Sequence, residues 1–282
     1  FEVGTNAPPM HPRCRCTISA VVGKKWRATV DRQQAALLDT ANLAKIRKIA
    51  ALSGNILTGG ISQALPTECV EAIVEQVKAA PENIRILWNM AQADMKILDS
   101  NYQGTAHYLQ EEKGIKLNIV ADTNAIDQKP YRTLIHEIGH LIDNWLENYS
   151  SYRSVNFQNG ALAATLKTEA EHYVKAKQDS LQIKNFDETY NVISKELMTM
   201  SALNQREVSD LWQGISDGKI HGRYGHSDRD YWTRENGDNI AKEAFAHMFC
   251  ATIQNPDAVI QIKKYFPKSY KIFERMIEEV YK

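Results

Sequence analysis

Apolar residues recur at helical spacing along much of the chain. Residues 26–53 show this period, and so do residues 66–80, which begin with a proline and carry early glutamates. Pro81 ends the second stretch, because proline cannot continue a helix, and a further helix is expected over 82–93. Later helices are expected over 134–143, within 160–218, over 239–254 and in the stretch that follows.

Three short stretches in the middle of the chain favour β-structure instead. Residues 95–99, 106–110 and 115–122 are strand candidates, and the EEKG sequence between the last two suits a hairpin turn. The KLNIV segment alternates polar and apolar positions, as a half-exposed edge strand does. We therefore expect an α+β fold that is mostly helical, with a small mixed β-sheet before the helix at 134–143 and a cleft between the sheet and the later helices.

Glycine and proline positions divide the chain into parts. The stretch GNILTGGISQALP, residues 54–66, interrupts the helical pattern with three glycines and a proline, which predicts a linker. The N-terminal residues are rich in proline and lack a helical period. The expected organisation is an extended tail over 1–20, a helical linker region over 21–62 and one large domain over 63–282.

Composition excludes several classes of protein. The chain has 282 residues, 43% of them hydrophobic, and a formal net charge of zero, which gives no general attraction to nucleic acid or to an acidic membrane surface. No window approaches the roughly 18 apolar residues of a membrane span, and no signal peptide opens the sequence. Because the first residue is Phe rather than Met, we expect a fragment of a longer protein. Cys69 and Cys250 are expected to be buried thiols rather than part of a disulfide scaffold.

The segment LIHEIGHLID, residues 134–143, carries the strongest chemical signal. One α-helical turn spans about 3.6 residues, so His136 and His140 project from one face, one turn apart. Their imidazoles can share a metal ion, and Glu137 beside them can take the proton of a water molecule that attacks a carbonyl. The flanking residues are apolar, and unpaired buried polar groups cost about 1–3 kcal/mol each, a cost that a metal removes. The segment therefore predicts a zinc site.

Asp143 extends the same polar stripe, since it lies seven residues after His136. It could orient a ligand histidine through a hydrogen bond. It could also be a ligand itself, or a carboxylate at the helix end that pairs with a surface lysine.

A third ligand is required, because a catalytic zinc site combines three protein ligands with a water molecule. The segment NIAKEAFAHMF offers Glu243 among apolar residues. Glu243 is either a surface residue at the edge of the helix or a buried carboxylate with a cation nearby. His247 lies one turn later on the same face, as an alternative ligand, a partner of a ligand or a residue of the core.

The two motifs together resemble those of the gluzincin metallopeptidases, in particular the catalytic domain of anthrax lethal factor and its relatives. The resemblance lies in HEIGHLID and, much later, in KEAFAHMF, which fits the E-x-F-A-x-x-F helix of that family. It implies a zincin-like fold in which His136, His140 and Glu243 hold Zn²⁺ and Glu137 is the catalytic base. It also implies that the strand at 115–122 lines the cleft and pairs with an extended substrate.

The chain departs from that family in two respects. About a hundred residues separate His140 from Glu243, more than is usual, and a helical insert at about 147–220 would account for the difference. The family often places a tyrosine near the zinc to stabilise the oxyanion, but Asn236 stands at the usual position. The candidates for that role, unless all are ordinary loop residues, are Tyr231, Tyr224 and His226.

The N-terminal residues carry a second resemblance. NAPPMHPRCRCT is similar to the end of phage minor head proteins of the MuF type, which commonly carry a C-terminal toxin or enzyme domain. This implies a prophage or mobile-element protein, carried in a phage virion or delivered into a target cell, with phage head or portal proteins and a cognate immunity protein as partners. His11, Cys14 and Cys16 have metal-ligand character, but a tetrahedral zinc site needs four ligands. Either residues upstream complete that site, or the tail binds no metal.

Two functions are therefore expected. The first is a zinc-dependent endopeptidase that acts on a protein or peptide substrate, with no nucleic acid or membrane partner. The second is a capsid-associated structural module with a vestigial or structural zinc site, in which Asp143 or His247 replaces water as the fourth ligand. Glu137 favours the first function, because a structural site has no use for a base.

Overall fold

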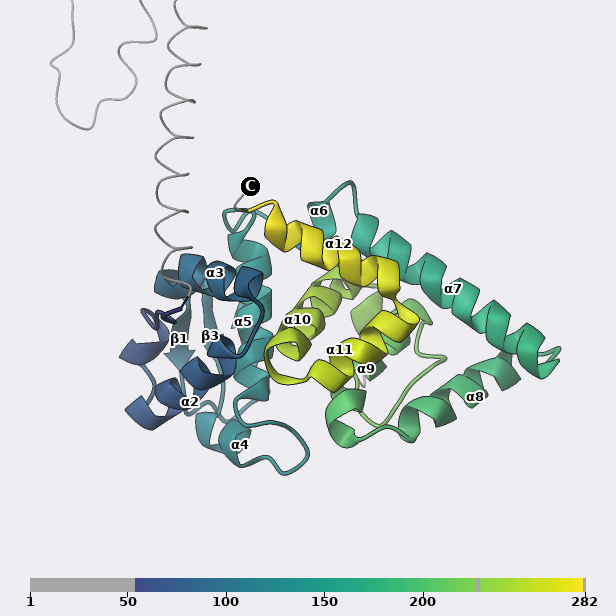
Figure 1. Ribbon diagram of the computed structural model, residues 1–282, viewed down its shortest axis with the longest axis horizontal. Helices are drawn as coiled ribbons and strands as arrows, with labels where there is room; N and C mark the ends of the chain where they lie inside the picture. Colours follow the sequence, from purple (N-terminus) through teal and green to yellow (C-terminus); the bar gives the residue numbers. More distant parts are fainter. Residues whose placement is uncertain (1–53, 227–228, 281–282) are drawn as a thin grey trace, which may run out of the picture. The chain divides into compact units, whose positions relative to one another are not determined.

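The fold is taken from a computed structural model, which describes residues 54–226 and 229–280 (Figure 1). The chain divides into two compact units, Phe1–Lys48 and Ile49–Lys282, and every described residue belongs to the second unit. The expected tail, with its metal-ligand candidates, and the helix expected over 26–53 therefore lie outside the described residues.

Helices make up most of the described chain. The first part contains, in order, η1 (Ile61–Gln63), α2 (Thr67–Lys78), α3 (Glu82–Ala91), η2 (Gln92–Asp94), β1 (Lys96–Asp99), β2 (His107–Leu109), β3 (Gly114–Lys116), α4 (Ile119–Asn124) and α5 (Arg132–Trp145). The second part contains α6 (Arg153–Asn156), α7 (Ala161–Leu181), α8 (Phe186–Met198), α9 (Ala202–Ile215), η3 (Arg229–Trp232), η4 (Arg234–Gly237), α10 (Asn239–Gln254), α11 (Pro256–Tyr265) and α12 (Pro267–Glu278). This confirms a mostly helical α+β fold. Among the described helices, none is both long and apolar enough to cross a membrane.

The three strands form one small mixed sheet with the order β1-β3-β2. β1 runs parallel to β3, and β2 pairs with β3 in antiparallel register, with Tyr108 opposite Ile115. The strands expected at 95–99 and 106–110 are confirmed, and so is the turn between the second and third strands. The sheet lies before α5 in the chain, as expected.

The third strand differs from the prediction in both its length and its place. β3 ends at Lys116, and α4 begins at Ile119, because the side chain of Asn118 accepts a hydrogen bond from the backbone N–H of Ala121 and caps that helix. The strand expected over 115–122 is therefore wrong beyond residue 116. β3 is also the central strand rather than an edge strand, and β2 is at the edge.

The stretch 54–66 is part of the folded core rather than a linker. Ile56 and Ile61 are buried, and Leu57 exchanges hydrogen bonds with the Asn89 and Trp88 side chains of α3. A Cβ on Gly60 would lie only 2.4 Å from the backbone oxygen of Met95, the residue after η2. The glycine therefore allows these two backbone segments to come into close contact. These contacts contradict the prediction that the glycines and the proline mark a linker.

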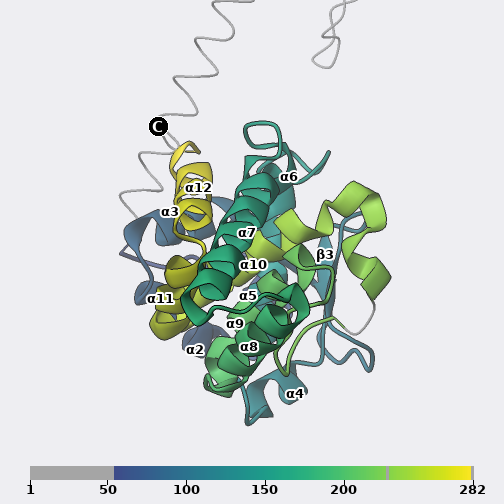
Figure 2. The same ribbon diagram turned by 90° about the vertical axis from the view of Figure 1, so that its right-hand side faces the viewer.

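The helices form layers around α10. In Figure 1 the sheet and α2–α4 lie on one side of α5, and α7–α9 lie on the other side of α10. Figure 2 looks from the side of α7 and α8, with α10 and α5 behind them. α10 packs most extensively against α5 and then against α9, so most of its side chains are buried, the polar Asn239, Glu243 and His247 among them.

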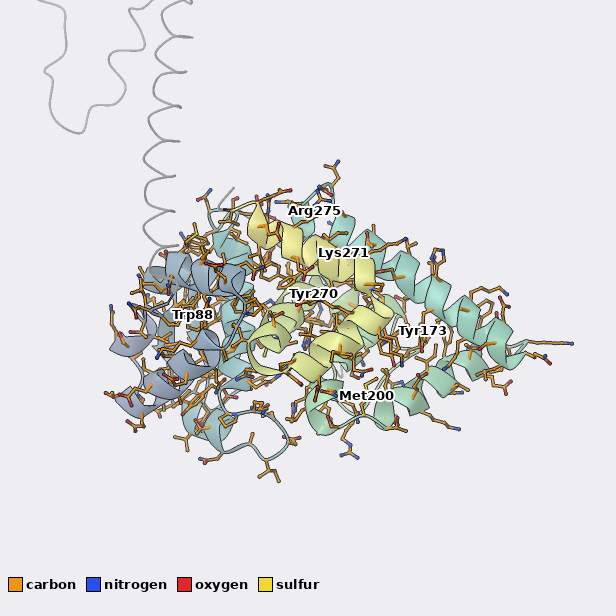
Figure 3. All side chains as sticks on the ribbon, viewed as in Figure 1. Trp88, Tyr173, Met200, Tyr270, Lys271 and Arg275 are labelled. Atoms are coloured by element: carbon orange, nitrogen blue, oxygen red, sulfur yellow. The ribbon has the colours of Figure 1, made fainter. Side chains whose placement is uncertain are left out.

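Aromatic side chains fix α9 against α7 and α11. The ring of Trp212 lies 5.6 Å from that of Tyr173, 5.5 Å from Tyr265 and 5.1 Å from Phe266, measured between centroids. Figure 3 shows Tyr173 where α7 approaches the end of α11. The helical insert expected at about 147–220 is thus tied to the C-terminal helices by ring packing.

The start of α5 is capped by a carboxylate from another helix. Tyr131, at the N-cap position, has a positive φ of 64° and makes no side-chain cap. Asp122 of α4 takes that role, since its oxygens accept from the backbone N–H groups of Thr133 and Leu134, both at 3.0 Å. A buried carboxylate at a helix N-terminus also interacts favourably with the helix dipole.

We therefore expect Asp122→Ala to lower the free energy of unfolding by about 2 kcal/mol, because it removes a charged cap from α5. Urea denaturation measures this change. Glu71→Ala, on the exposed surface of α2, is the control and should change the stability by less than about 0.5 kcal/mol. Equal stability of the two variants would show that Asp122 does not hold the start of α5.

Candidate metal centre

Two histidines of α5 face the same carboxylate. His136 Nε2 lies 3.3 Å from Glu243 Oε2, and His140 Nε2 lies 3.5 Å from Glu243 Oε1. The three residues form a group whose ligand atoms all lie within 4.8 Å of one another. The structure therefore brings together the three residues that the sequence assigned to zinc, although a hundred residues separate the two helices.

The distances in this group match a shared ion better than an ion pair. Charge-assisted N–H···O bonds are shorter, at about 2.7–2.9 Å. Two atoms that each lie about 2.0–2.1 Å from one tetrahedral ion are about 3.3 Å apart. Glu243 is 3% exposed, and its Oε2 has no hydrogen-bond partner among the described residues. A buried carboxylate oxygen without a donor is costly unless a cation binds it, so the residues present fit a zinc ion.

The surroundings shift the pKa values of the two imidazoles in opposite directions. Burial and then the nearby His247 lower the pKa of His136 to about 3, so its ring is neutral, which is the form that binds a metal. Burial also opposes the charging of His140, but Glu243 raises the pKa of that ring above its ordinary value. Glu243 thus attracts a positive charge to the point where the predicted ion would lie.

The two helices meet at Gly139, the glycine of HEIGH. A Cβ at this position would lie 2.9 Å from the Cα of Ala246, closer than real Cβ atoms approach a backbone. The absence of a side chain therefore lets α5 and α10 come close enough for Glu243 to face both histidines.

Glu137 points to the edge of the sheet. Its Oε2 accepts a 2.8 Å hydrogen bond from the backbone N–H of Tyr108 in β2, and the Tyr108 hydroxyl donates to Asn144 on α5. The side chain is buried, and this burial raises the pKa of Glu137. A carboxylate with a raised pKa, held in place beside the ligand pair, is suited to accept a proton.

A cavity of about 400 Å³ opens at this cluster. Its walls come from β2 and the preceding loop, from α5, and from the loop before α6. The remaining wall comes from the loop before η3 and from η3, η4 and α10. The lining residues are Thr105, Ala106, His107, Tyr108, His136, Glu137, His140, Tyr152, His226, Tyr231, Arg234, Asn239, Lys242 and Glu243. The cavity is large enough for part of a peptide to approach the candidate metal ligands.

Two of the three candidates for oxyanion stabilisation lie at the cluster. The Tyr231 hydroxyl donates a hydrogen bond to Glu243, and the His226 ring stacks on Tyr231 with 3.9 Å between centroids and 4° between planes. His226 Nε2 lies 3.9 Å from Glu243 Oε1. Burial, and then the charge of Glu243, raise the pKa of Tyr231, so its hydroxyl keeps its proton and can donate it in a hydrogen bond.

Tyr224 does not take part, and the prediction for it is wrong. Its hydroxyl donates to Asp127 at 2.9 Å, and its ring carries the Arg206 guanidinium at 4.1 Å. It is not among the residues that line the cavity. The same loop brings His226, two residues later, to the cavity, a difference that sequence spacing alone could not reveal.

Asp143 is fully buried and bound to the next helix. Its carboxylate accepts from the backbone N–H of Ser154 at 2.7 Å and from the Ser154 hydroxyl at 2.5 Å, near the start of α6. Burial raises the pKa of Asp143 to about 7. The interpretation of a surface carboxylate paired with lysine is therefore wrong, and Asp143 does not belong to the ligand group. Orientation of a ligand histidine by Asp143 stays a prediction.

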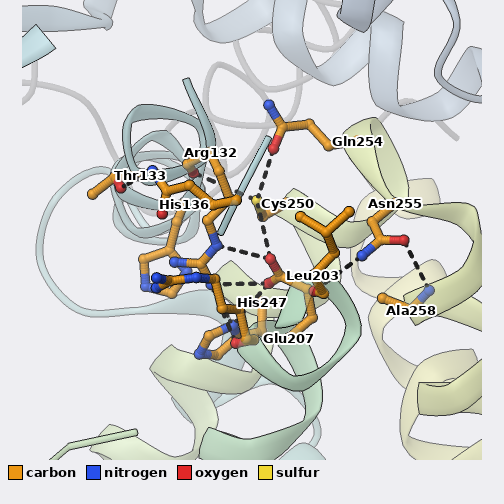
Figure 4. A network of polar contacts seen from close by, with 12 residues as sticks. Arg132, Thr133, His136, Leu203, Glu207, His247, Cys250, Gln254, Asn255 and Ala258 are labelled. Carbon is orange, nitrogen blue, oxygen red and sulfur yellow. Dashed lines mark hydrogen bonds and ion pairs between the residues drawn. The ribbon is translucent and has the colours of Figure 1, made fainter. Parts of the chain in front are cut away.

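His247 belongs to a group of four charged side chains, each at most 12% exposed, which is called here the buried ion network: Arg132, Glu207, Asp210 and His247. Figure 4 labels three of them, Arg132, Glu207 and His247. Its Nδ1 lies 3.0 Å from Glu207, and its Nε2 lies 3.1 Å from Asp210. Burial alone would lower the pKa of His247, but these two carboxylates raise it to about 9. His247 is therefore a charged partner of two acids rather than a core residue surrounded by apolar groups.

The other members of the buried ion network were not predicted from the sequence. Arg132 bonds Glu207 through Nε at 2.8 Å and through Nη2 at 3.1 Å. The available signal was weak: Glu207 and Asp210 alternate with the apolar residues Val208, Leu211 and Trp212 of α9, but buried polar residues such as Gln205 and Ser209 lie among them. Buried acids of this kind require a partner.

Two imidazoles, one carboxylate and an adjacent base can hold a catalytic metal ion, and zinc is the ion that this donor set suits best. Such a group can promote the attack of water on a carbonyl. In comparisons with protein-family models, curated proteins and solved structures, nothing matches the chain. The geometry of the centre is therefore the main argument for its function.

We expect Gly139→Ala to weaken zinc binding by about tenfold or more, although no ligand changes, because the added methyl group pushes α10 away from α5. Competition with a chromophoric chelator measures the zinc dissociation constant. Gly54→Ala is the control, since no atom lies within 4 Å of its added Cβ. If both variants bound zinc as the unchanged protein does, close helix approach would not be needed for the site.

Proposed function

We propose that the protein is a zinc-dependent endopeptidase. One observation carries the proposal: the nitrogens of His136 and His140 lie 3.3 and 3.5 Å from the oxygens of Glu243, which is the spacing of ligands on one tetrahedral ion. The ion would polarise the scissile carbonyl and make a water molecule more acidic. Glu137 and the cavity beside it supply the base and the space that hydrolysis needs.

The residues around the predicted ion have separate tasks in this proposal. Glu137 takes a proton from the attacking water and passes it to the leaving amine, while the Tyr108 N–H holds the carboxylate in place. Tyr231 and His226 donate hydrogen bonds to the oxygen that becomes negative in the tetrahedral transition state. Their stacking keeps both donors on one side of the cavity.

The substrate in this proposal is an extended peptide segment that lies along β2. β2 is one of the two edge strands of the sheet, and its residues His107 and Tyr108 line the cavity with the preceding loop. A peptide can add to a sheet edge through main-chain hydrogen bonds, which favours β2 rather than the stretch 115–122 as the substrate-pairing strand.

The resemblance to lethal factor and to phage head proteins remains part of the proposal. The phage-like tail lies outside the described residues, so carriage in a virion, delivery into a target cell, and phage head, portal or immunity proteins as partners are predictions from the sequence. The alternative, a structural zinc module, requires a fourth protein ligand. Asp143 is engaged by Ser154, and both ring nitrogens of His247 face other carboxylates, so neither residue supports that alternative.

The metal part of the proposal predicts one zinc ion per chain and its loss in Glu243→Ala, because two imidazoles alone bind zinc weakly. Elemental analysis of protein dialysed against trace zinc measures the content. Glu171→Ala, on the exposed face of α7, is the matched control and should keep the ion. Equal zinc in Glu243→Ala and the unchanged protein would exclude Glu243 as the third ligand.

The chemical part of the proposal predicts that Glu137→Gln keeps zinc and loses at least about 100-fold in peptide cleavage, because the amide cannot accept the proton. The fluorescence released from a fluorogenic peptide library measures the rate of cleavage, and mass spectrometry identifies the bond that is cleaved. Retained cleavage in Glu137→Gln, or cleavage that persists after zinc is removed by a chelator, would contradict the mechanism.

A further inference from the structure

The buried ion network lies one helical turn behind the candidate metal ligands. Arg132 is four residues before His136 on α5, and His247 is four residues after Glu243 on α10, so each shares a helix face with a ligand. The network therefore extends the metal-binding faces of both helices. Figure 4 shows Arg132 and His247 converging on Glu207, with His136 beside them.

α9 supplies the two carboxylates that join these faces. Glu207 binds Arg132 through two parallel bonds, at 2.8 and 3.1 Å, and takes His247 Nδ1 at 3.0 Å. Arg132 Nη2 also lies 3.2 Å from that nitrogen, but both atoms are donors when the ring is charged, so the shared carboxylate is what brings them together. One side chain of α9 thus fixes the relative position of α5 and α10.

Asp210 connects the network to the other wall of the cavity. Its Oδ2 faces His247 Nε2 at 3.1 Å, while its Oδ1 accepts from the backbone N–H of His226 at 3.1 Å and lies 3.3 Å from His226 Nδ1. His226 stacks on Tyr231, which reaches Glu243. Asp210 therefore touches both α10 and the residues that face the predicted substrate.

Stability alone does not account for these charges. Replacing a buried ion pair by apolar residues of similar size is often neutral or stabilising. α9 is already held by the ring packing of Trp212 with Tyr173, Tyr265 and Phe266. The ion network also fixes the orientation of the side chains in it, because hydrogen bonds are directional and apolar packing is much less so.

A second metal ion is the competing explanation, since Asp210, Glu243 and His247 also form a compact group. The contacts oppose it. Both ring nitrogens of His247 already face carboxylates, and the Arg132 guanidinium lies close enough to repel a second cation. Arg132 and His247 also balance Glu207 and Asp210, so the network is neutral as a unit and the charge of Glu243 remains for the predicted ion.

We propose that Glu207 and Asp210 are positioning residues for the metal centre. Through Arg132 and His247 they set the direction in which His136 and Glu243 face each other, and Asp210 also sets His226. α9, which the sequence indicated only as part of an insert, then supplies the two side chains that orient the metal centre. This inference rests on the proposed metal centre, but it does not require the substrate to be a peptide.

Asp210→Asn tests the proposal directly, because it keeps the shape of the side chain but removes its charge. It also places an NH₂ group where His247 Nε2 and the N–H groups of His226 now donate to a carboxylate. We expect the zinc dissociation constant to rise by about 10–100-fold. We also expect the visible spectrum of the cobalt-substituted protein, which reports coordination geometry, to change in band position and intensity. If the protein cleaves peptides, kcat should fall while KM changes little, since His226 acts on the transition state.

Glu169→Gln is the matched control for a purely structural effect. Glu169 is a buried carboxylate that caps α12 through the N–H groups of Lys268 and Ser269, without a contact to the metal centre. It should lower stability yet leave the zinc affinity and the cobalt spectrum of the folded protein unchanged. A second variant, Arg132→Met with Glu207→Leu, replaces an ion pair by apolar residues and removes the acceptor of His247 Nδ1. It should fold with a loss of about 1–3 kcal/mol in stability and bind zinc less tightly.

Each outcome decides the question. Unchanged zinc affinity and an unchanged cobalt spectrum in Asp210→Asn, or in the folded double variant if Asp210→Asn does not fold, would overturn the positioning role. Two zinc ions per chain, with one lost in Asp210→Asn, would also overturn it and assign a second metal site. One tightly bound zinc without any peptide cleavage would contradict the peptidase proposal but not the positioning role. No zinc binding at all would overturn both.

Discussion

The candidate metal centre depends on how closely the backbones of α5 and α10 approach each other. Three ligands can share one ion only if their helices meet within a side chain's length, and here the helices touch where Gly139 faces Ala246. A larger residue at either position would separate the carboxylate of Glu243 from the imidazoles of α5. The same contact makes α10 the central helix of the fold, enclosed by α5, α9 and α11.

Burial of so many charged groups around this contact needs compensation, and the fold provides it locally. Several buried carboxylates are paired with backbone N–H groups at helix starts: Asp122 at α5, Asp143 at α6 and Glu169 at α12. Others are paired with cations in the buried ion network. Glu243 differs, since its Oε2 has no donor among the described residues. That contrast is the physical reason for assigning a cation to this carboxylate and not to the others.

The sequence predicted the parts of the site that depend on short-range periodicity. The spacing of His136 and His140 on one helix face, the helix around Glu243, and the mostly helical α+β character all follow from local patterns that the structure contains. The meeting of the two helices could be expected only through a family resemblance, because no local pattern encodes a contact across a hundred residues.

Features that depend on tertiary contact were missed or mistaken. Gly59 and Gly60 serve close packing rather than marking a linker, and Asn118 caps α4 where the alternating pattern predicted that the strand continues. The roles of Glu207 and Asp210 appear only when α9 lies against α10. In each case the deciding energy comes from a partner distant in sequence, which propensity and periodicity do not contain.

The most direct test of the central claim is an anomalous-scattering measurement at the zinc edge on crystals grown with the metal. We expect one strong peak about 2.0–2.2 Å from Nε2 of His136, Nε2 of His140 and a carboxylate oxygen of Glu243. A peak coordinated instead by Asp210 and His247, or no peak within reach of His136 and His140, would contradict the claim.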